Sequence, residues 1–200
     1  MYVPSFPTKR YSIVYADPPW EYRDKALAGK RGACCKYPVL GLENIKALPV
    51  KQIQMEDCAL FLWATWPLLD QCLDVMRAWG FTYKTAAFVW LKENKHSKGL
   101  KVGMGGWTRA NTEVCLLGVR GRMKRLSASV RQPIVSPIRA HSKKPDEVYS
   151  RIEELLGDLP RLELFATQRW PGWDSWGSRK YRIIDPFPSL FDSRNTGRFA

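Results

Sequence analysis

Four consecutive residues near the start of the chain, Asp17, Pro18, Pro19 and Trp20, combine groups that could act on an aromatic amine. Such an amine is a poor nucleophile because its lone pair is delocalised into the ring. The Asp17 carboxylate and the Pro18 carbonyl, held in a rigid setting because the proline ring fixes φ, could accept both N–H groups. The lone pair would then point at an electrophilic methyl group. Such a site would act by positioning and electrostatics more than by proton transfer.

The last residue of this motif, Trp20, offers a flat ring on which a base extruded from a nucleic acid could stack. The motif directly follows residues 11–16, a run rich in β-branched and aromatic side chains that predicts a short buried strand. The plainer alternative is a strand that ends in an ordinary Pro-Pro turn, with Trp20 in the core. The place of the motif at the end of a buried strand favours the functional interpretation.

The elements that must position this motif alternate between strands and helices. Further strands are predicted at residues 58–65, 85–91, 113–119, 134–137 and 161–166, and helices at 42–48, 67–80 and 145–156. Most of these strands are apolar throughout, which is typical of strands buried on both faces. The pattern predicts an α/β fold with a mainly parallel sheet and helices on both faces. In such sheets, ligands bind beyond the C-terminal ends of the strands.

The composition narrows the classes to which the chain can belong. Its 200 residues, 45% hydrophobic and 26% charged, suit one globular domain over residues 1–185, followed by a flexible Pro/Ser/Arg-rich tail over 186–200. No apolar run reaches the length of a membrane span, and residues 1–10 lack the apolar centre of a signal peptide. We therefore expect a cytoplasmic protein without membrane contact. The five cysteines form no Cys-x-x-Cys pair and there are two histidines, so no metal site is expected.

The positive charge of the chain is concentrated in one segment. The net charge is +13, and residues 92–144 alone hold 13 basic and two acidic side chains. A localised basic zone predicts a polyanion partner such as a nucleic acid, whereas the plainer alternative is a solvated basic loop. Two loops, 92–109 and 120–131, could line the phosphate backbone, and Trp107 and Arg109 could add stacking and charge as substrate-binding residues.

Taken together, these segments resemble the MT-A70 family of adenine-N6 methyltransferases, which includes messenger-RNA enzymes and bacterial and phage DNA enzymes. The similarity runs from about residue 11 to 181, in the same order as in the family. It is carried by ADPPW at 16–20, YPVLGLE at 37–43, LFLWAT at 60–65, WGF at 79–81, VWLK at 89–92, EVCLLGVRG at 113–121, HSKKPDEVY at 141–149, LELFA at 162–166 and GWDSWG at 172–177. The resemblance implies a Rossmann-like fold that uses S-adenosyl-L-methionine (SAM), with the catalytic motif preceding the SAM-binding segment.

The resemblance also implies roles for single residues. It assigns catalysis to the motif at residues 17–20, the target-adenine pocket to Tyr37, an active-site carboxylate to Glu113 and a place near the cofactor to Lys144. Asp17 would serve mainly the target amine and secondarily the cofactor. Without the resemblance, Glu113 is interpreted as a charge at a strand edge, and Lys144 equally well as a solvated residue before a helix.

The SAM-binding segment is expected around the last predicted strand. Glu163, Phe165 and the turn as far as residue 177 would hold the adenosine and ribose. Two positions depart from the family. Many members have Arg where this chain has Thr167, and Asn followed by Glu or Gln where it has Ser178 and Arg179. These positions usually hydrogen-bond the ribose, so the contacts to SAM are expected to be weaker or rearranged.

Several functions remain open at this point. We favour DNA as the substrate because the chain is compact and has none of the long extra segments common in the eukaryotic RNA enzymes, and RNA remains an alternative. A non-catalytic nucleic-acid-binding subunit is a second hypothesis, which the intact motif argues against and the altered ribose positions favour. N4-methylation of cytosine is a third, since related Pro-Pro motifs serve that amine. Whether the chain acts alone or as a homo- or heterodimer is also open.

Overall fold

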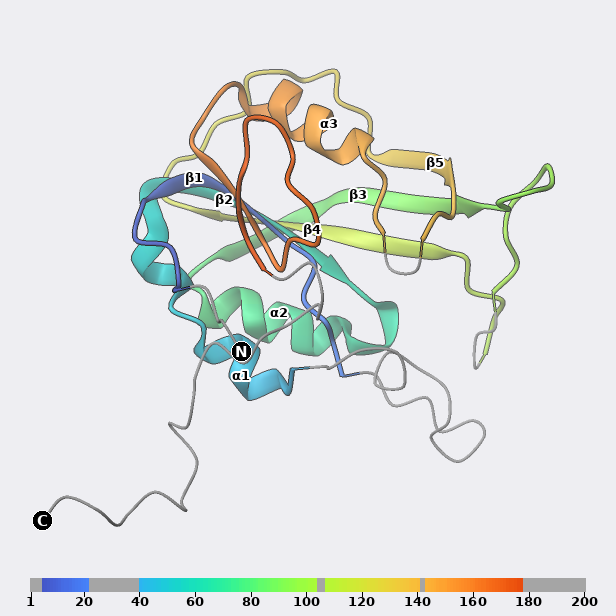
Figure 1. The fold of residues 1–200 in the computed structure, drawn as a ribbon, viewed down its shortest axis with the longest axis horizontal. Coiled ribbons are helices and arrows are strands. Elements are labelled where there is room, and N and C mark those ends of the chain that lie inside the picture. Colours follow the sequence, from blue (N-terminus) through green and yellow to red (C-terminus); the bar gives the residue numbers. More distant parts are fainter. Residues whose placement is uncertain (1–4, 22–39, 104–106, 141–142, 178–200) are drawn as a thin grey trace, which may run out of the picture.

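The computed structural model describes residues 5–21, 40–103, 107–140 and 143–177. They form a seven-stranded sheet in the order β5-β3-β4-β2-β1-β6-β7 (Figure 1). The strands are β1 (Tyr11–Ala16), β2 (Gln54–Ala64), β3 (Thr82–Glu93), β4 (Thr112–Arg120), β5 (Pro133–Pro137), β6 (Arg161–Leu164) and β7 (Asp174–Trp176). The helices are α1 (Leu42–Ala47), α2 (Leu69–Ala78) and α3 (Glu147–Leu156), with short 3-10 turns η2 (Val50–Ile53) and η3 (Trp66–Leu68). None of the helices in these ranges is long and apolar enough to cross a membrane.

The sheet is mainly parallel, as predicted, with β4 as the exception. β1 pairs in parallel with β2 and β6, and the pairs β3–β5 and β6–β7 are also parallel. β4 lies antiparallel between β2 and β3. The first residues of β4 therefore lie at the edge of the sheet where the other described strands end. We call this the C-terminal edge.

Helices cover both faces of the sheet, which confirms the predicted layers. α1 and α2 pack on one face through Ile45, Cys72, Val75, Met76 and Trp79. α3 packs on the other face through Val148, Tyr149, Ile152 and Leu156 (Figure 1). β1 is buried along its whole length because it lies between β2 and β6 and because helices cover both faces of the sheet. This central strand carries the motif at its C-terminal end.

Several helices and strands begin or end at residues other than those predicted. The helix expected from Pro67 begins with the turn η3, and α3 begins at Glu147, two residues after the predicted start. β2 and β3 are longer than predicted, because pairing extends into polar residues. The strand β7 is absent from the prediction. Its three residues pair with β6, within a segment that was expected to form a turn. The predicted boundary at residue 185 and the tail lie outside the described residues.

Candidate active site

The C-terminal edge of the sheet gathers residues that are far apart in the sequence. Asp17 directly follows β1, and Phe165 directly follows β6. Glu113 is the second residue of β4, and reaches the same edge because that strand runs in the opposite direction. Lys92 lies one residue before the end of β3, and Lys144 lies in the segment before α3.

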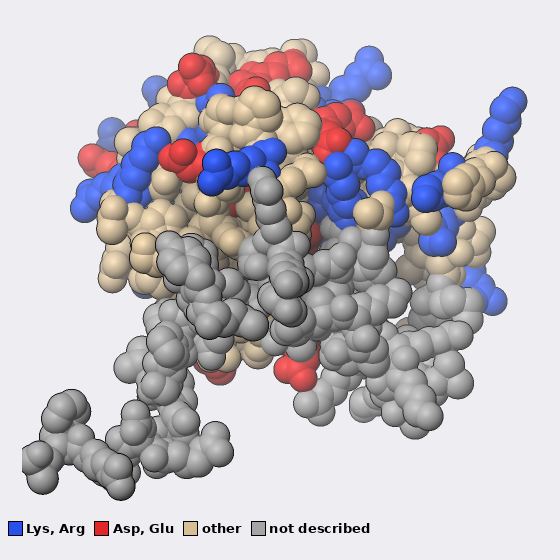
Figure 2. Space-filling model, in the orientation of Figure 1, with Lys and Arg blue, Asp and Glu red and all other residues tan. Residues whose placement is uncertain are grey.

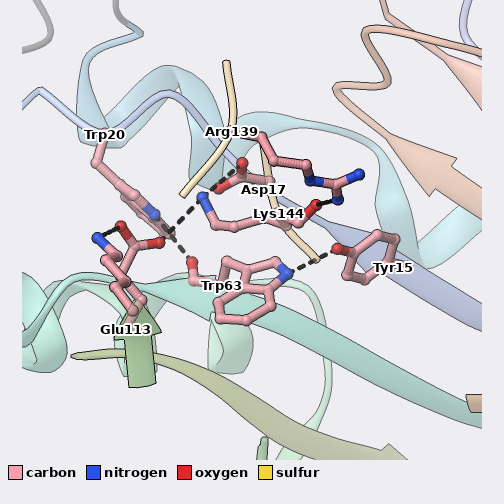
Figure 3. Close-up of polar contacts among 8 residues, drawn as sticks. Tyr15, Asp17, Trp20, Trp63, Glu113, Arg139 and Lys144 are labelled. Carbon is pink, nitrogen blue, oxygen red and sulfur yellow. Dashed lines mark hydrogen bonds and ion pairs between the residues drawn. The ribbon is translucent and has the colours of Figure 1, made fainter. Parts of the chain in front are cut away.

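These side chains form a chain of alternating charge, the charge network of Lys92, Glu113, Lys144 and Asp17 (Figure 3). Lys144 Nζ lies 2.8 Å from Asp17 Oδ2 and 3.2 Å from Glu113 Oε2. The other oxygen of Glu113, Oε1, lies 2.5 Å from Lys92 Nζ. All four side chains are less than a third exposed, so solvent screens these contacts much less than it would at the open surface.

Strand periodicity explains why the network lies on the α3 side of the sheet. Alternate residues of a strand point to the same face. Asp17 follows Tyr15 by two residues and Glu113 precedes Cys115 by two, and both Tyr15 and Cys115 pack in the α3-side core. Two indoles of the same face lie under the ammonium groups: Lys144 Nζ lies 5.4 Å from the ring centre of Trp63, and Lys92 Nζ lies 5.2 Å from that of Trp90.

The network sets the protonation of its members. Burial alone would raise the pKa of Glu113, but Lys144 and Lys92 outweigh it and lower that pKa to about 2. Burial would lower the pKa of Lys144, but Asp17 and Glu113 raise it, so the ammonium stays charged. Burial raises the pKa of Asp17, although contact with Lys144 opposes the rise. Glu113 is therefore a permanent anion, whereas Asp17 is the carboxyl that most readily takes up a proton.

Lys144 is held in place by a residue that the sequence did not single out. Arg139 donates from Nη2 to the Lys144 carbonyl at 2.8 Å and also forms an ion pair with Asp146 at the start of α3. Lys92 was likewise not assigned a role, although it lies within the VWLK segment. It was predicted as the first residue of a basic loop, whereas β3 extends to Glu93, so Lys92 lies two residues after Trp90 on the same face of that strand.

The structure corrects the role predicted for Trp20. Its side chain is 6% exposed and packs with the core of the α1 and α2 face, and its Nε1 donates to the Trp63 carbonyl at 2.9 Å. Trp20 therefore anchors the motif to β2 and does not present an open ring for stacking. The Pro18 carbonyl accepts a hydrogen bond from the Trp20 amide at 2.9 Å, which leaves one of its two lone pairs for a ligand. Pro19 accepts one from the Leu40 amide at 3.3 Å.

The predicted SAM segment occupies the ends of β6 and β7. Glu163 is buried and accepts a hydrogen bond from the Tyr149 hydroxyl at 2.9 Å, so this carboxylate meets α3 rather than an open pocket. Burial raises its pKa to about 7, although the Tyr149 bond acts in the opposite direction. Phe165 is buried with φ +64, a left-handed conformation that ends β6, and Thr167 is exposed. Tyr37, Ser178 and Arg179 lie outside the described residues.

The two basic loops adjoin opposite ends of β4, one before the strand and one after it. Trp107 and Arg109 are exposed in the segment that joins β3 to β4, at the C-terminal edge. Lys and Arg side chains gather on this side of the molecule (right in Figure 2). Residues 121–131 begin where β4 ends, at the opposite edge, and then pass the end of α3, where the Leu126 amide donates to the Leu155 carbonyl at 2.7 Å. The second loop then returns along the sheet: the Gln132 carbonyl, just beyond it, accepts a hydrogen bond at 3.1 Å from the Val89 amide, three residues before the first loop begins.

The side chains at the C-terminal edge fit the amino-acid part of SAM. This cofactor carries an ammonium and a carboxylate, which are complementary to Asp17 and Lys144 respectively. The turn after β6 is also fixed: Gly177 lies so close to it that a Cβ there would fall 2.4 Å from the Ala166 carbonyl oxygen. In the part of the chain that the structure describes, no group of three or more His, Cys, Asp or Glu side chains could hold a metal ion.

Several known proteins are similar to this chain in sequence. A model of the MT-A70 family matches residues 11–179. The type II methyltransferase M.MunI of a Mycoplasma species is 34% identical over 192 residues, covering 87% of this chain and 79% of the relative. The human N(6)-adenosine-methyltransferase catalytic subunit METTL3 is 27% identical, covering 88% of this chain and 30% of the relative, and a Drosophila melanogaster MT-A70-like protein is 29% identical with 88% and 28% covered. The chain thus spans less than a third of these two longer relatives. MT-A70 methyltransferases use SAM as methyl donor, and this chain belongs to the MT-A70 family.

Proposed function

We propose that this protein transfers the methyl group of SAM to N6 of adenine in DNA. The observation that carries the proposal is the Asp17 carboxylate, held at the C-terminal end of the central strand by Lys144 at 2.8 Å. Only Oδ2 of Asp17 is bonded among the described residues, and the side chain is 25% exposed. Oδ1 can therefore accept a hydrogen bond from a base that enters the site.

Asp17 and Pro18 can together orient the target amine. Oδ1 of Asp17 accepts one N–H group and the free lone pair of the Pro18 carbonyl accepts the other, which directs the nitrogen lone pair out of conjugation. When bound, SAM supplies a methyl group on a positively charged sulfur. As the N–C bond forms and the C–S bond breaks, the amine becomes cationic, and Asp17 stabilises this charge. The surplus proton can then pass to Oδ1, whose proton affinity burial has increased.

The rest of the charge network keeps this geometry fixed. Glu113 and Asp17 hold Lys144 between them, and Lys92 holds Glu113 from the far side. Two cations and two anions balance, so the partly buried site has no uncompensated charge. Lys144 can therefore approach the cofactor carboxylate without leaving an isolated anion behind.

DNA is the favoured substrate because of the name of one similar protein. M.MunI is named a type II methyltransferase, and this chain covers 79% of it. The relatives named N(6)-adenosine-methyltransferases support chemistry at N6 of adenine, and RNA is the alternative polymer. The departures at Thr167, Ser178 and Arg179 favour a second candidate, a non-catalytic subunit that binds nucleic acid. The intact Asp17–Lys144 contact argues against that candidate.

A product assay tests the proposal directly. Purified protein is incubated with methyl-labelled SAM and, in separate reactions, with duplex DNA, single-stranded DNA and RNA, and the labelled nucleoside is identified by mass spectrometry. We expect labelled N6-methyl-deoxyadenosine from DNA, and about 100- to 1000-fold slower labelling with the Asp17→Asn variant. N6-methyladenosine found only in RNA would overturn the choice of polymer, and N4-methylcytosine would overturn the choice of base. No label in any reaction, from folded protein, would favour the non-catalytic subunit.

A further inference from the structure

An exposed indole lies at the C-terminal edge of the sheet. Trp66 begins η3, two residues after β2 ends, at the same edge of the sheet as Asp17 and Glu113. Its side chain is 46% exposed, whereas Trp20 and Trp63 of the same edge are buried. The molecule thus presents a large aromatic surface to solvent at the edge of the sheet that also holds the carboxylate proposed to receive the target amine.

The orientation of this indole is fixed by the protein itself. Trp66 Nε1 donates to Thr112 Oγ1 at 2.9 Å, and Thr112 immediately precedes Glu113 on β4. The indole N–H is the only polar group of the side chain, so its hydrogen-bonding requirement is already met. Pro67 restricts the backbone that follows, and the Leu68 amide donates to the Thr65 carbonyl at 3.0 Å. What remains available for a ligand is the exposed part of the ring, which can interact by stacking.

The other aromatic candidates are less suited to this role. Trp20, which the sequence suggested, is in the core. Trp107 is fully exposed, and no described residue holds its ring in place. A side chain that is ordered only on binding loses rotamer freedom, whereas one that is already held does not, so Trp66 offers stacking at a smaller entropic cost.

We propose that Trp66 is a binding residue on which a base of the substrate strand stacks at the entrance to the catalytic edge. This inference rests on the proposed methyl transfer to a nucleic acid. Base–aromatic stacking tolerates any base, because every base has a π-face. Trp66 would therefore supply affinity and orientation for the strand, while Asp17 acts on the amine.

Tyr83 provides a matched control for the test. It is also 46% exposed, but it lies at the start of β3, where it pairs with Gly118 near the opposite edge of the sheet. The variants are Trp66→Ala, Trp66→Phe, Thr112→Val and Tyr83→Ala. Each is assayed for kcat and for KM with the DNA that the product assay identifies, and for SAM binding as a check of folding. A second set of duplexes carries 2-aminopurine at the methylated position or beside it, and its fluorescence reports stacking.

We expect Trp66→Ala to raise KM for DNA about tenfold and to remove the quenching of 2-aminopurine, with SAM binding unchanged. Trp66→Phe should keep most of the affinity, and Thr112→Val should show an intermediate loss because the ring is freed. Tyr83→Ala should match the wild type. A Trp66→Ala protein with KM within twofold of wild type and unchanged quenching would overturn this inference alone. A wild type that methylates nothing would instead overturn the proposed function on which it rests.

Discussion

Two carboxyl-bearing regions on the α3 side of the sheet differ in what surrounds their acids. The charge network places Glu113 between two ammonium groups, with a pKa of about 2. In the second region, on β6, Glu163 accepts a hydrogen bond from the neutral Tyr149 hydroxyl, and burial raises its pKa to about 7. Two glutamates on one sheet face, one partly buried and one buried, thus become an anion and an acid that is half-protonated near neutral pH. Whether a buried glutamate is charged depends on the cations that the fold brings to it.

The largest effect is expected for the residue that links the charge network to the substrate. Asp17→Asn keeps the size of the side chain but removes its negative charge, so kcat should fall about 100- to 1000-fold. Binding of SAM should weaken less than tenfold, because Asp17 mainly serves the target amine. Steady-state kinetics and titration calorimetry measure the two quantities. Equal losses of turnover and of SAM binding would show that Asp17 serves the cofactor first.

The next prediction removes one of the cations that set the pKa of Glu113. Lys92→Met takes away the 2.5 Å contact, so the pKa of Glu113 should rise from about 2 towards its ordinary value, while Lys144 still opposes the effect of burial. The acid limb of the pH dependence of kcat should move upward, and kcat at neutral pH should fall about tenfold. Lys95→Met, an exposed lysine of the same loop, is the control. If the acid limb of the kcat profile does not move, Lys92 does not control the pKa of Glu113.

A smaller effect, on stability, is expected in the second region. Because the folded pKa of Glu163 lies near 7 and the ordinary value is 4.5, the folded state binds more protons than the unfolded state between these two pH values. The free energy of unfolding should therefore decrease as pH rises from 4.5 to 7, by on the order of 2 kcal/mol from this group. Glu163→Gln should remove that part of the pH dependence. Urea unfolding at pH 5 and pH 7.5 tests it, and equal slopes in both proteins would contradict the assignment.

The smallest effect is expected when only the partner of Glu163 is changed. Tyr149→Phe removes the 2.9 Å hydrogen bond but keeps the ring, which stacks on Trp170 at 4.3 Å. The free energy of unfolding should fall by about 1 kcal/mol. The hydrogen bond lowers the pKa of Glu163, so its loss should raise that pKa further. Methyl transfer should change less than twofold, and a loss as large as that of Lys92→Met would mean that the two regions are coupled.

The sequence by itself determined the fold class and the position of the motif. Apolar runs that alternate with segments of helical periodicity predicted a mainly parallel α/β sheet covered on both faces. This works because the spacing of apolar side chains along the sequence shows which face of each element is buried. The motif could be placed at the end of a buried strand, since residues 11–16 are rich in β-branched and aromatic side chains and the Pro-Pro pair ends the strand. Glu113 and Lys144 entered through the resemblance to the family, and they lie in the charge network.

Only the tertiary structure decided how these residues meet. The antiparallel direction of β4 brings Glu113 to Lys92 and Lys144, and it makes the second basic loop begin at the opposite edge. It likewise decided that Trp20 is buried while Trp66 is exposed, although both follow buried strands. Periodicity reports which side chains are buried, but not which strands are neighbours or in which direction each one runs. Those features depend on contacts between segments that are distant in the chain, and local sequence does not encode them.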